Sequence, residues 1–177
     1  RRQRQMCIRD RIMTEKFIKL SSAQIRWLII ISFIFALIID SMVLLNQSLA
    51  FIPPITLLMV LYWSSHVVDR TYFVSAFILG TLADALYQTT LGAHALLYVV
   101  IVFMMLRIRL QFKTYPAWQQ AFIIGIYLLV YQALHTLFFS PVLDDGSFVP
   151  YWSMPAAGIL IWPLLESMMN KITQSST

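Results

Sequence analysis

Six apolar runs, separated by short polar segments, account for most of this 177-residue chain. They cover approximately residues 24–45, 53–63, 72–87, 93–106, 118–139 and 151–169. A transmembrane helix needs about 20 predominantly apolar residues, so six such helices would take up roughly two thirds of the chain. The pattern predicts an all-α membrane protein, a bundle of about six transmembrane helices that forms a single integral-membrane domain over residues 13–177.

The positive charge gives the predicted bundle an orientation, because all 13 Lys and Arg residues lie on one side of the six spans. Arg26 and the basic residues before it precede the first span, Arg70 lies between the second and third, and Lys171 follows the sixth. The others lie between the fourth and fifth spans: Arg107, Arg109 and Lys113. Cytoplasmic loops carry an excess of Lys and Arg, so we expect both termini in the cytoplasm. The predicted location is the bacterial cytoplasmic (inner) membrane, crossed several times.

The composition agrees with a membrane protein, since 59% of the residues are hydrophobic and 12% are charged, whereas soluble domains carry about 25% charged residues. Residues 1–12 are predicted to be a non-native or disordered basic leader; the alternative is a native basic arm that binds anionic lipid. The leader holds five Arg and Asp10, so without it the net charge falls from +5 to +1. The basic pI is therefore no indication of a nucleic-acid partner.

The second span is short and starts at Pro53 and Pro54, because proline is tolerated in the first turn of a helix. It ends near Tyr62 and Trp63. We interpret this aromatic pair as part of a belt at the cytoplasmic face of the membrane.

Polar and ionisable side chains inside spans are costly, so each is a candidate functional residue. Five of them fall in the outer third of the predicted bundle: Asp40, Asp84, Gln88, His94 and His135. Gln88 is expected to follow Asp84 on the same face of the third span. Asp84 and His94 are equally far from the middle of the short turn between the third and fourth spans, which predicts a hydrogen bond between them. The pair is either a clamp between two helices or a proton-sensitive or solute-binding site. We favour the clamp, because no chain of ionisable groups continues inward.

A stripe of small residues on the third span, Ala76 and Gly80 followed by Asp84, would let another helix approach closely. Spacing alone does not decide between a span of this chain and a helix of a partner, although internal packing is the more common outcome.

The chain lacks the sequence patterns of common catalytic sites. It has no His-Glu-x-x-His zinc motif and no glycine-rich phosphate loop, and its single cysteine lies in the predicted leader. We therefore expect a protein that is not an enzyme and that needs no metal or cofactor.

Three stretches carry a resemblance to the rod-shape-determining membrane protein family MreD. They are "PPITLLMVLYWS" in the second span, "AFILGTLADALYQTTLGAHALLY" across the third and fourth, and "WQQAFIIGIYLLVYQ" in the fifth. The resemblance extends over nearly everything after Met13. One departure is Gln88, where family members often have glycine.

The resemblance implies a non-enzymatic scaffold of the lateral cell-wall elongation machinery that maintains rod shape. Such a scaffold binds MreC and, through it, is linked to the MreB cytoskeleton, to RodA and to its transpeptidase partner. The residues that match the family motif are Gly80, Asp84, Gly92 and His94. The family fold is also similar to the substrate-binding membrane subunits of vitamin transporters. The alternative function is therefore binding of a small solute by the outer polar residues.

Overall fold

The computed structural model describes residues 22–45, 51–67, 72–139 and 145–175. These residues form six α-helices and no strand, which confirms the predicted all-α fold for the described part of the chain. The helices are α2 (Ser22–Leu45), α3 (Ile55–His66), α4 (Phe73–Tyr87), α5 (Ala93–Phe112), α6 (Ala117–Phe139) and α7 (Asp145–Ser175). The predicted leader, residues 1–12, lies outside the described residues.

Three of these helices are long and apolar enough to cross a membrane: Arg26–Leu45 of α2, Ala93–Phe112 and Ala117–Phe139. The apolar helix α4 is shorter. Two helices extend beyond the apolar runs that predicted them, because α5 continues through Arg107 and Arg109 and α7 begins at Asp145. Arginine is a good helix former, so a charged membrane boundary need not coincide with the end of the helix.

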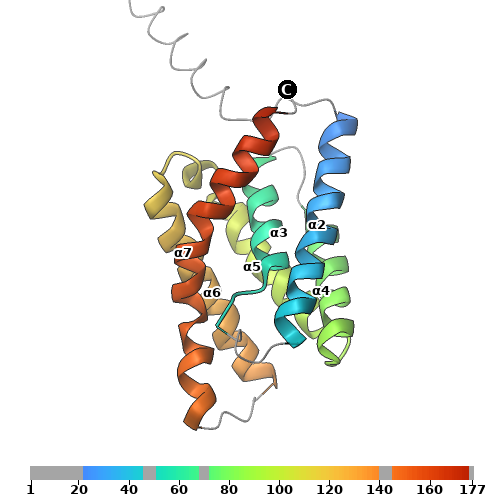
Figure 1. Cartoon of the computed structure of the whole chain (residues 1–177), viewed down its shortest axis with the longest axis vertical. Helices are drawn as coiled ribbons and strands as arrows, with labels where there is room; N and C mark the ends of the chain where they lie inside the picture. The colour runs from blue at the N-terminus through green and yellow to red at the C-terminus, as the bar shows by residue number, and fades with distance from the viewer. Residues whose placement is uncertain (1–21, 46–50, 68–71, 140–144, 176–177) are drawn as a thin grey trace, which may run out of the picture.

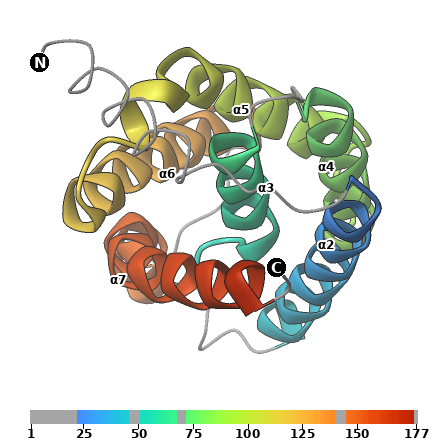
Figure 2. The ribbon, with the colours of Figure 1, turned by 90° about the horizontal axis from the view of Figure 1, so that it is seen from above.

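The short helix α3 lies in the centre of the bundle, and the other five helices surround it (Figures 1 and 2). All residues from Thr56 to His66 are buried. Twelve residues extend only about 18 Å as an α-helix, which is less than the roughly 30 Å hydrocarbon core of a bilayer. α3 therefore forms the core of the protein rather than a span in contact with lipid.

The interpretation of Tyr62 and Trp63 as an interfacial belt is wrong. Both side chains are completely buried. The Tyr62 hydroxyl donates to Asn170 Oδ1 of α7 (2.8 Å), and Trp63 Nε1 donates to Ser32 Oγ of α2 (2.9 Å). Because α3 is enclosed, the polar atoms of its aromatic residues are satisfied by neighbouring helices and not by water at a membrane surface.

Around α3, the helices follow the order α2, α4, α5, α6 and α7, as seen end-on in Figure 2. The large apolar side chains on the outside of this ring are exposed, among them Ile34, Phe77, Phe122 and Leu160. Lipid tails are as apolar as these side chains, so a bilayer can cover them without cost.

The antiparallel pair of α4 and α5 depends on Gly80. A Cβ atom added there would lie 2.7 Å from Ala95 N and 2.9 Å from His94 C, in the backbone of α5. Ala76 and Asp84, one turn away on either side, are completely buried. The small-residue stripe on α4 thus packs against another helix of the same chain, as the more common alternative predicted.

Candidate functional site: a polar layer at the helix ends

The predicted polar residues lie at the end of the bundle where α2, α4 and α6 finish and α3, α5 and α7 begin. At this end, which we call the turn end, α4 and α5 are joined by a short turn (Figure 1). We use "polar layer" for four residues of the turn end: Asp40, Asp84, His94 and His135.

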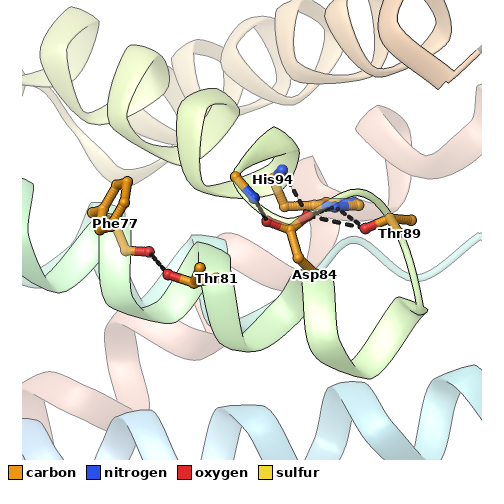
Figure 3. A network of polar contacts seen from close by, with 6 residues as sticks. Phe77, Thr81, Asp84, Thr89 and His94 are labelled. Carbon is orange, nitrogen blue, oxygen red and sulfur yellow. Dashed lines mark hydrogen bonds and ion pairs between the residues drawn. The ribbon is translucent and has the colours of Figure 1, made fainter.

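Asp84 is completely buried and binds both the turn and the first residues of α5 (Figure 3). Its Oδ1 accepts hydrogen bonds from the backbone N–H of His94 (2.9 Å), from His94 Nδ1 (2.7 Å) and from Thr89 Oγ1 (2.9 Å). Its Oδ2 accepts one from Gly92 N (2.8 Å). The predicted Asp84–His94 hydrogen bond is confirmed, and the carboxylate also satisfies backbone donors that α5 leaves free at its N-terminus.

Two residues in the left-handed conformation shape this turn. Gln88 (φ 53°) ends α4, and Gly92 (φ 98°) precedes α5. The backbone N–H groups of Gln88 and Thr89 both donate to Asp84 O, which closes the last turn of α4. Glycine adopts this conformation at the least cost, so Gln88 lies at a position that favours glycine.

The prediction that Gln88 follows Asp84 on the same helix face is wrong. The chain leaves the helix at Gln88, so the rule that residues four apart share a face no longer applies. The Gln88 side chain is exposed, whereas Asp84 is completely buried.

Asp40 of α2 makes an equivalent contact with the N-terminus of α3. Its Oδ1 accepts from Ile55 N (2.7 Å) and its Oδ2 from Thr56 N (3.0 Å). Pro54, at the N-cap position, makes no side-chain capping bond. The carboxylate therefore replaces an ordinary capping residue, and its negative charge lies at the helix end that favours it.

Lys113 is a structural residue that the sequence analysis missed, because its charge indicated only topology. It is buried, and its Nζ donates to His66 O (2.8 Å) at the C-terminus of α3. No local pattern identifies this role, since the two residues are 47 positions apart.

His135 connects α6 to α7 and lies beside His94. Its Nδ1 is 3.0 Å from the Tyr151 hydroxyl, which is also 3.0 Å from Thr136 Oγ1. The neighbouring Gln132 is buried and donates to the backbone oxygen of Tyr151. The ring centroids of His94 and His135 are 5.4 Å apart. The structure thus brings together two predicted site residues that are distant in sequence.

A groove on the side of the bundle contains none of the polar-layer residues. It has a volume of about 410 Å³ and lies between α2 and α4. Its lining is almost entirely apolar: Ile34, Leu37, Ile38, Ser41, Leu82, Ala85 and Leu86. Among the described residues, no group of three or more His, Cys, Asp or Glu side chains could hold a metal ion.

Comparison with known proteins identifies the family. Residues 21–172 match the family model of the rod shape-determining protein MreD. The chain is also similar to "Rod shape-determining protein MreD" from Haemophilus influenzae, with 26% identity over 128 residues, which are 68% of this chain and 74% of that protein. No solved structure matches the chain significantly. Since the family model extends over most of its length, this chain belongs to the MreD family of rod shape-determining proteins.

Proposed function

We propose that this protein is a non-enzymatic scaffold of the bacterial lateral cell-wall elongation complex and that it maintains rod shape by binding MreC. Membership of the MreD family, which indicates a role in determining rod shape, is the observation that carries the proposal. Through MreC, the scaffold is connected to the MreB cytoskeleton, to RodA and to its transpeptidase partner.

The proposed location is the cytoplasmic membrane, with several spans and both termini in the cytoplasm. The described basic residues support this orientation. Arg26 is near the start of α2, Lys113 follows α5 and Lys171 is near the end of α7. All three positions lie at the end of the bundle opposite the turn end. Because cytoplasmic segments hold the excess of Lys and Arg, the polar layer would then lie toward the outer face.

The apolar exterior is the surface that we propose for MreC, through its single membrane span. The groove between α2 and α4 is a favourable part of it, because Ala85 and Ser41 are small and lie among larger side chains. Small residues let helix backbones approach closely in a membrane. The Ser41 hydroxyl already donates to Ile38 O (2.7 Å), so a helix in the groove would leave no polar atom unsatisfied.

Co-purification of the full chain with MreC from the same genome, in a mild detergent, tests the proposal. We expect a stoichiometric complex that survives high salt, because contacts between apolar surfaces are not screened as exposed ion pairs are. Absence of a complex, with both proteins stable and monodisperse, would contradict it.

A matched pair of substitutions tests the contact surface. Ala85→Phe fills the groove, whereas Ala133→Phe adds the same bulk at an exposed position of α6. We expect the first variant to lose MreC and the second to retain it. Equal retention by both would place the contact elsewhere on the bundle while leaving MreC binding itself intact.

The alternative function, binding of a small solute, is favoured by no observation on the described residues. The carboxylates of Asp40 and Asp84 are already occupied by backbone donors. The groove between α2 and α4 contains none of the polar-layer residues, and Ser41 is the one polar residue of its lining.

A further inference from the structure

A proline inside α7 leaves a backbone oxygen that is bound from α6 instead. Pro155 lies within α7 and has no backbone N–H to donate to the carbonyl oxygen four residues before it, which belongs to Tyr151. The Gln132 side chain of α6 donates from its Nε2 to this same oxygen. In a membrane, a backbone oxygen that a proline has freed is satisfied by a neighbouring helix, because water is absent. Gln132 makes this replacement for Pro155.

The surroundings of Gln132 give its amide N–H a specific importance. The side chain is completely buried, and its Oε1 has no hydrogen-bond partner among the described residues. A buried polar atom without a partner costs free energy, so an apolar side chain of similar size would be preferred here if the N–H were not needed. The bond to Tyr151 O therefore accounts for a glutamine at this position.

Tyr151 is also held by its side chain. Its hydroxyl is 3.0 Å from His135 Nδ1 and 3.0 Å from Thr136 Oγ1. Both residues belong to the turn of α6 that follows Gln132. A single turn of α6 thus binds one residue of α7 at its backbone and at its side chain. We call the contacts of Gln132, His135 and Thr136 with Tyr151 the Tyr151 latch.

The packing of α7 changes at Pro155. From this residue to the end of the helix, the positions three and four apart that share one face are buried: Pro155, Gly158, Trp162, Leu165 and Met169. Phe148 continues this face on the other side of Pro155, and its side chain is 54% exposed. The Tyr151 latch therefore binds α7 in the part of the helix where its inner face is no longer buried.

We infer that Pro155 is a joint in α7 and that the Tyr151 latch holds the segment Asp145–Met154 against α6. Proline in the interior of a helix removes a backbone hydrogen bond and allows the helix to bend at that point. Gln132 supplies the missing donor from another helix, so the two parts of α7 are connected through α6. Opening of the latch would free His135 and Thr136 from Tyr151 and allow the segment to move as a unit. This joint does not depend on the proposed binding of MreC.

A double-mutant cycle between Gln132 and Pro155 tests the role of the glutamine. Gln132→Leu leaves Tyr151 O without a donor, and we expect it to lower the unfolding temperature of the full chain in detergent by about 2–10 °C. Pro155→Ala restores the backbone N–H, so Gln132→Leu should cause no such decrease in that background. Pro163→Ala is the matched control, because the second proline frees the oxygen of Ile159, and the decrease should remain there.

Three results of this cycle would overturn the inference. They are an equal decrease in the wild-type and Pro155→Ala backgrounds, no decrease in the wild type, and failure of Pro155→Ala to rescue a Gln132→Leu variant that does not fold.

Hydrogen–deuterium exchange of the full chain tests the joint itself. Tyr151→Phe removes the hydroxyl contacts with α6 but keeps the backbone oxygen. We expect faster exchange over residues 145–154 and unchanged exchange over residues 156–175, because the joint separates the two parts of α7. Trp152→Phe, at a neighbouring position that is 39% exposed, is the control and should leave both unchanged. Equal acceleration along the whole of α7 in Tyr151→Phe, or none, would contradict a joint at Pro155.

Discussion

Asp40 and Lys113 hold the two ends of α3, and each carries the charge that its end of the helix favours. The Asp40 carboxylate accepts the N–H groups of Ile55 and Thr56 at the N-terminus, and Lys113 Nζ donates to His66 O at the C-terminus. Both residues come from other elements of the bundle. Since an N-terminus favours negative charge and a C-terminus positive charge, the pair stabilises a helix that is buried from Thr56 to His66.

Removal of the Asp40 carboxylate is expected to destabilise the bundle. In Asp40→Ala, two N–H groups at the start of α3 lose their acceptor, and each such group costs about 1–3 kcal/mol when buried. Thermal unfolding in detergent should show a clear decrease in the transition temperature. Ser41→Ala is the neighbouring control, because that hydroxyl bonds only within its own helix. Equal transition temperatures for the two variants would mean that Asp40 is not a required cap.

The contact between α4 and α5 predicts that Gly80→Ala is strongly destabilising. The new methyl group would meet the backbone of α5 at Ala95 and His94, which cannot rotate away. Overpacking of this kind typically costs about 1–3 kcal/mol. The measurement is again thermal unfolding, combined with the amount of folded protein recovered from the membrane.

Gly125→Ala is the matched control for Gly80. Its added methyl would lie 2.5 Å from Ile159 Cγ1 and 2.7 Å from Ile159 Cδ1, and a side chain can rotate away where a helix backbone cannot. Alanine also favours helix over glycine by about 1 kcal/mol. We therefore expect Gly125→Ala to have a small effect, and an effect as large as that of Gly80→Ala would contradict the proposed backbone contact.

A substitution that stabilises the protein is expected at Gln88. Its φ of 53° is in the left-handed region, which costs a residue with a side chain about 1–2 kcal/mol and costs glycine almost nothing. Gln88→Gly should raise the unfolding temperature. Thr90→Gly, in the same turn and without positive φ, should leave it unchanged or lower it. A lower unfolding temperature for Gln88→Gly would show that the exposed Gln88 side chain stabilises the protein by more than the backbone strain destabilises it.

Asp84 connects stability to the proposed function. Asp84→Asn replaces one acceptor oxygen by an NH₂ group, which accepts no hydrogen bond. The side chain therefore loses either the bond from Gly92 N or the bonds from Thr89 and His94. We expect lower stability and weaker rescue of rod shape in cells that lack their own MreD. Thr89→Val, which removes a single hydrogen bond to Asp84, should have a smaller effect on both. Normal folding and normal cell shape in Asp84→Asn would show that the polar layer is not required.

Much of the secondary structure and one contact of the polar layer could be predicted from the order of residues. Each apolar run became a helix, because hydrophobicity over about 20 residues is a local property of the chain. The Asp84–His94 hydrogen bond was also predictable, since a short turn leaves two antiparallel helices few ways to pair. The internal packing of Gly80 was also correctly favoured, because internal packing is the more common outcome for a stripe of small residues.

Only the tertiary structure decided which helix lies at the centre. In the folded chain Tyr62 and Trp63 are buried, and Lys113 binds the C-terminus of α3. The Gln88 side chain is exposed, and His94 lies beside His135. The physical reason is that the lipid around a membrane protein is itself apolar. Lipid tails are as apolar as a protein core, so in a membrane protein the apolar residues that face lipid and those that face another helix look alike in sequence. The sequence alone therefore determined approximately where the helices of the described residues lie along the chain, and three-dimensional packing determined which of their faces meet.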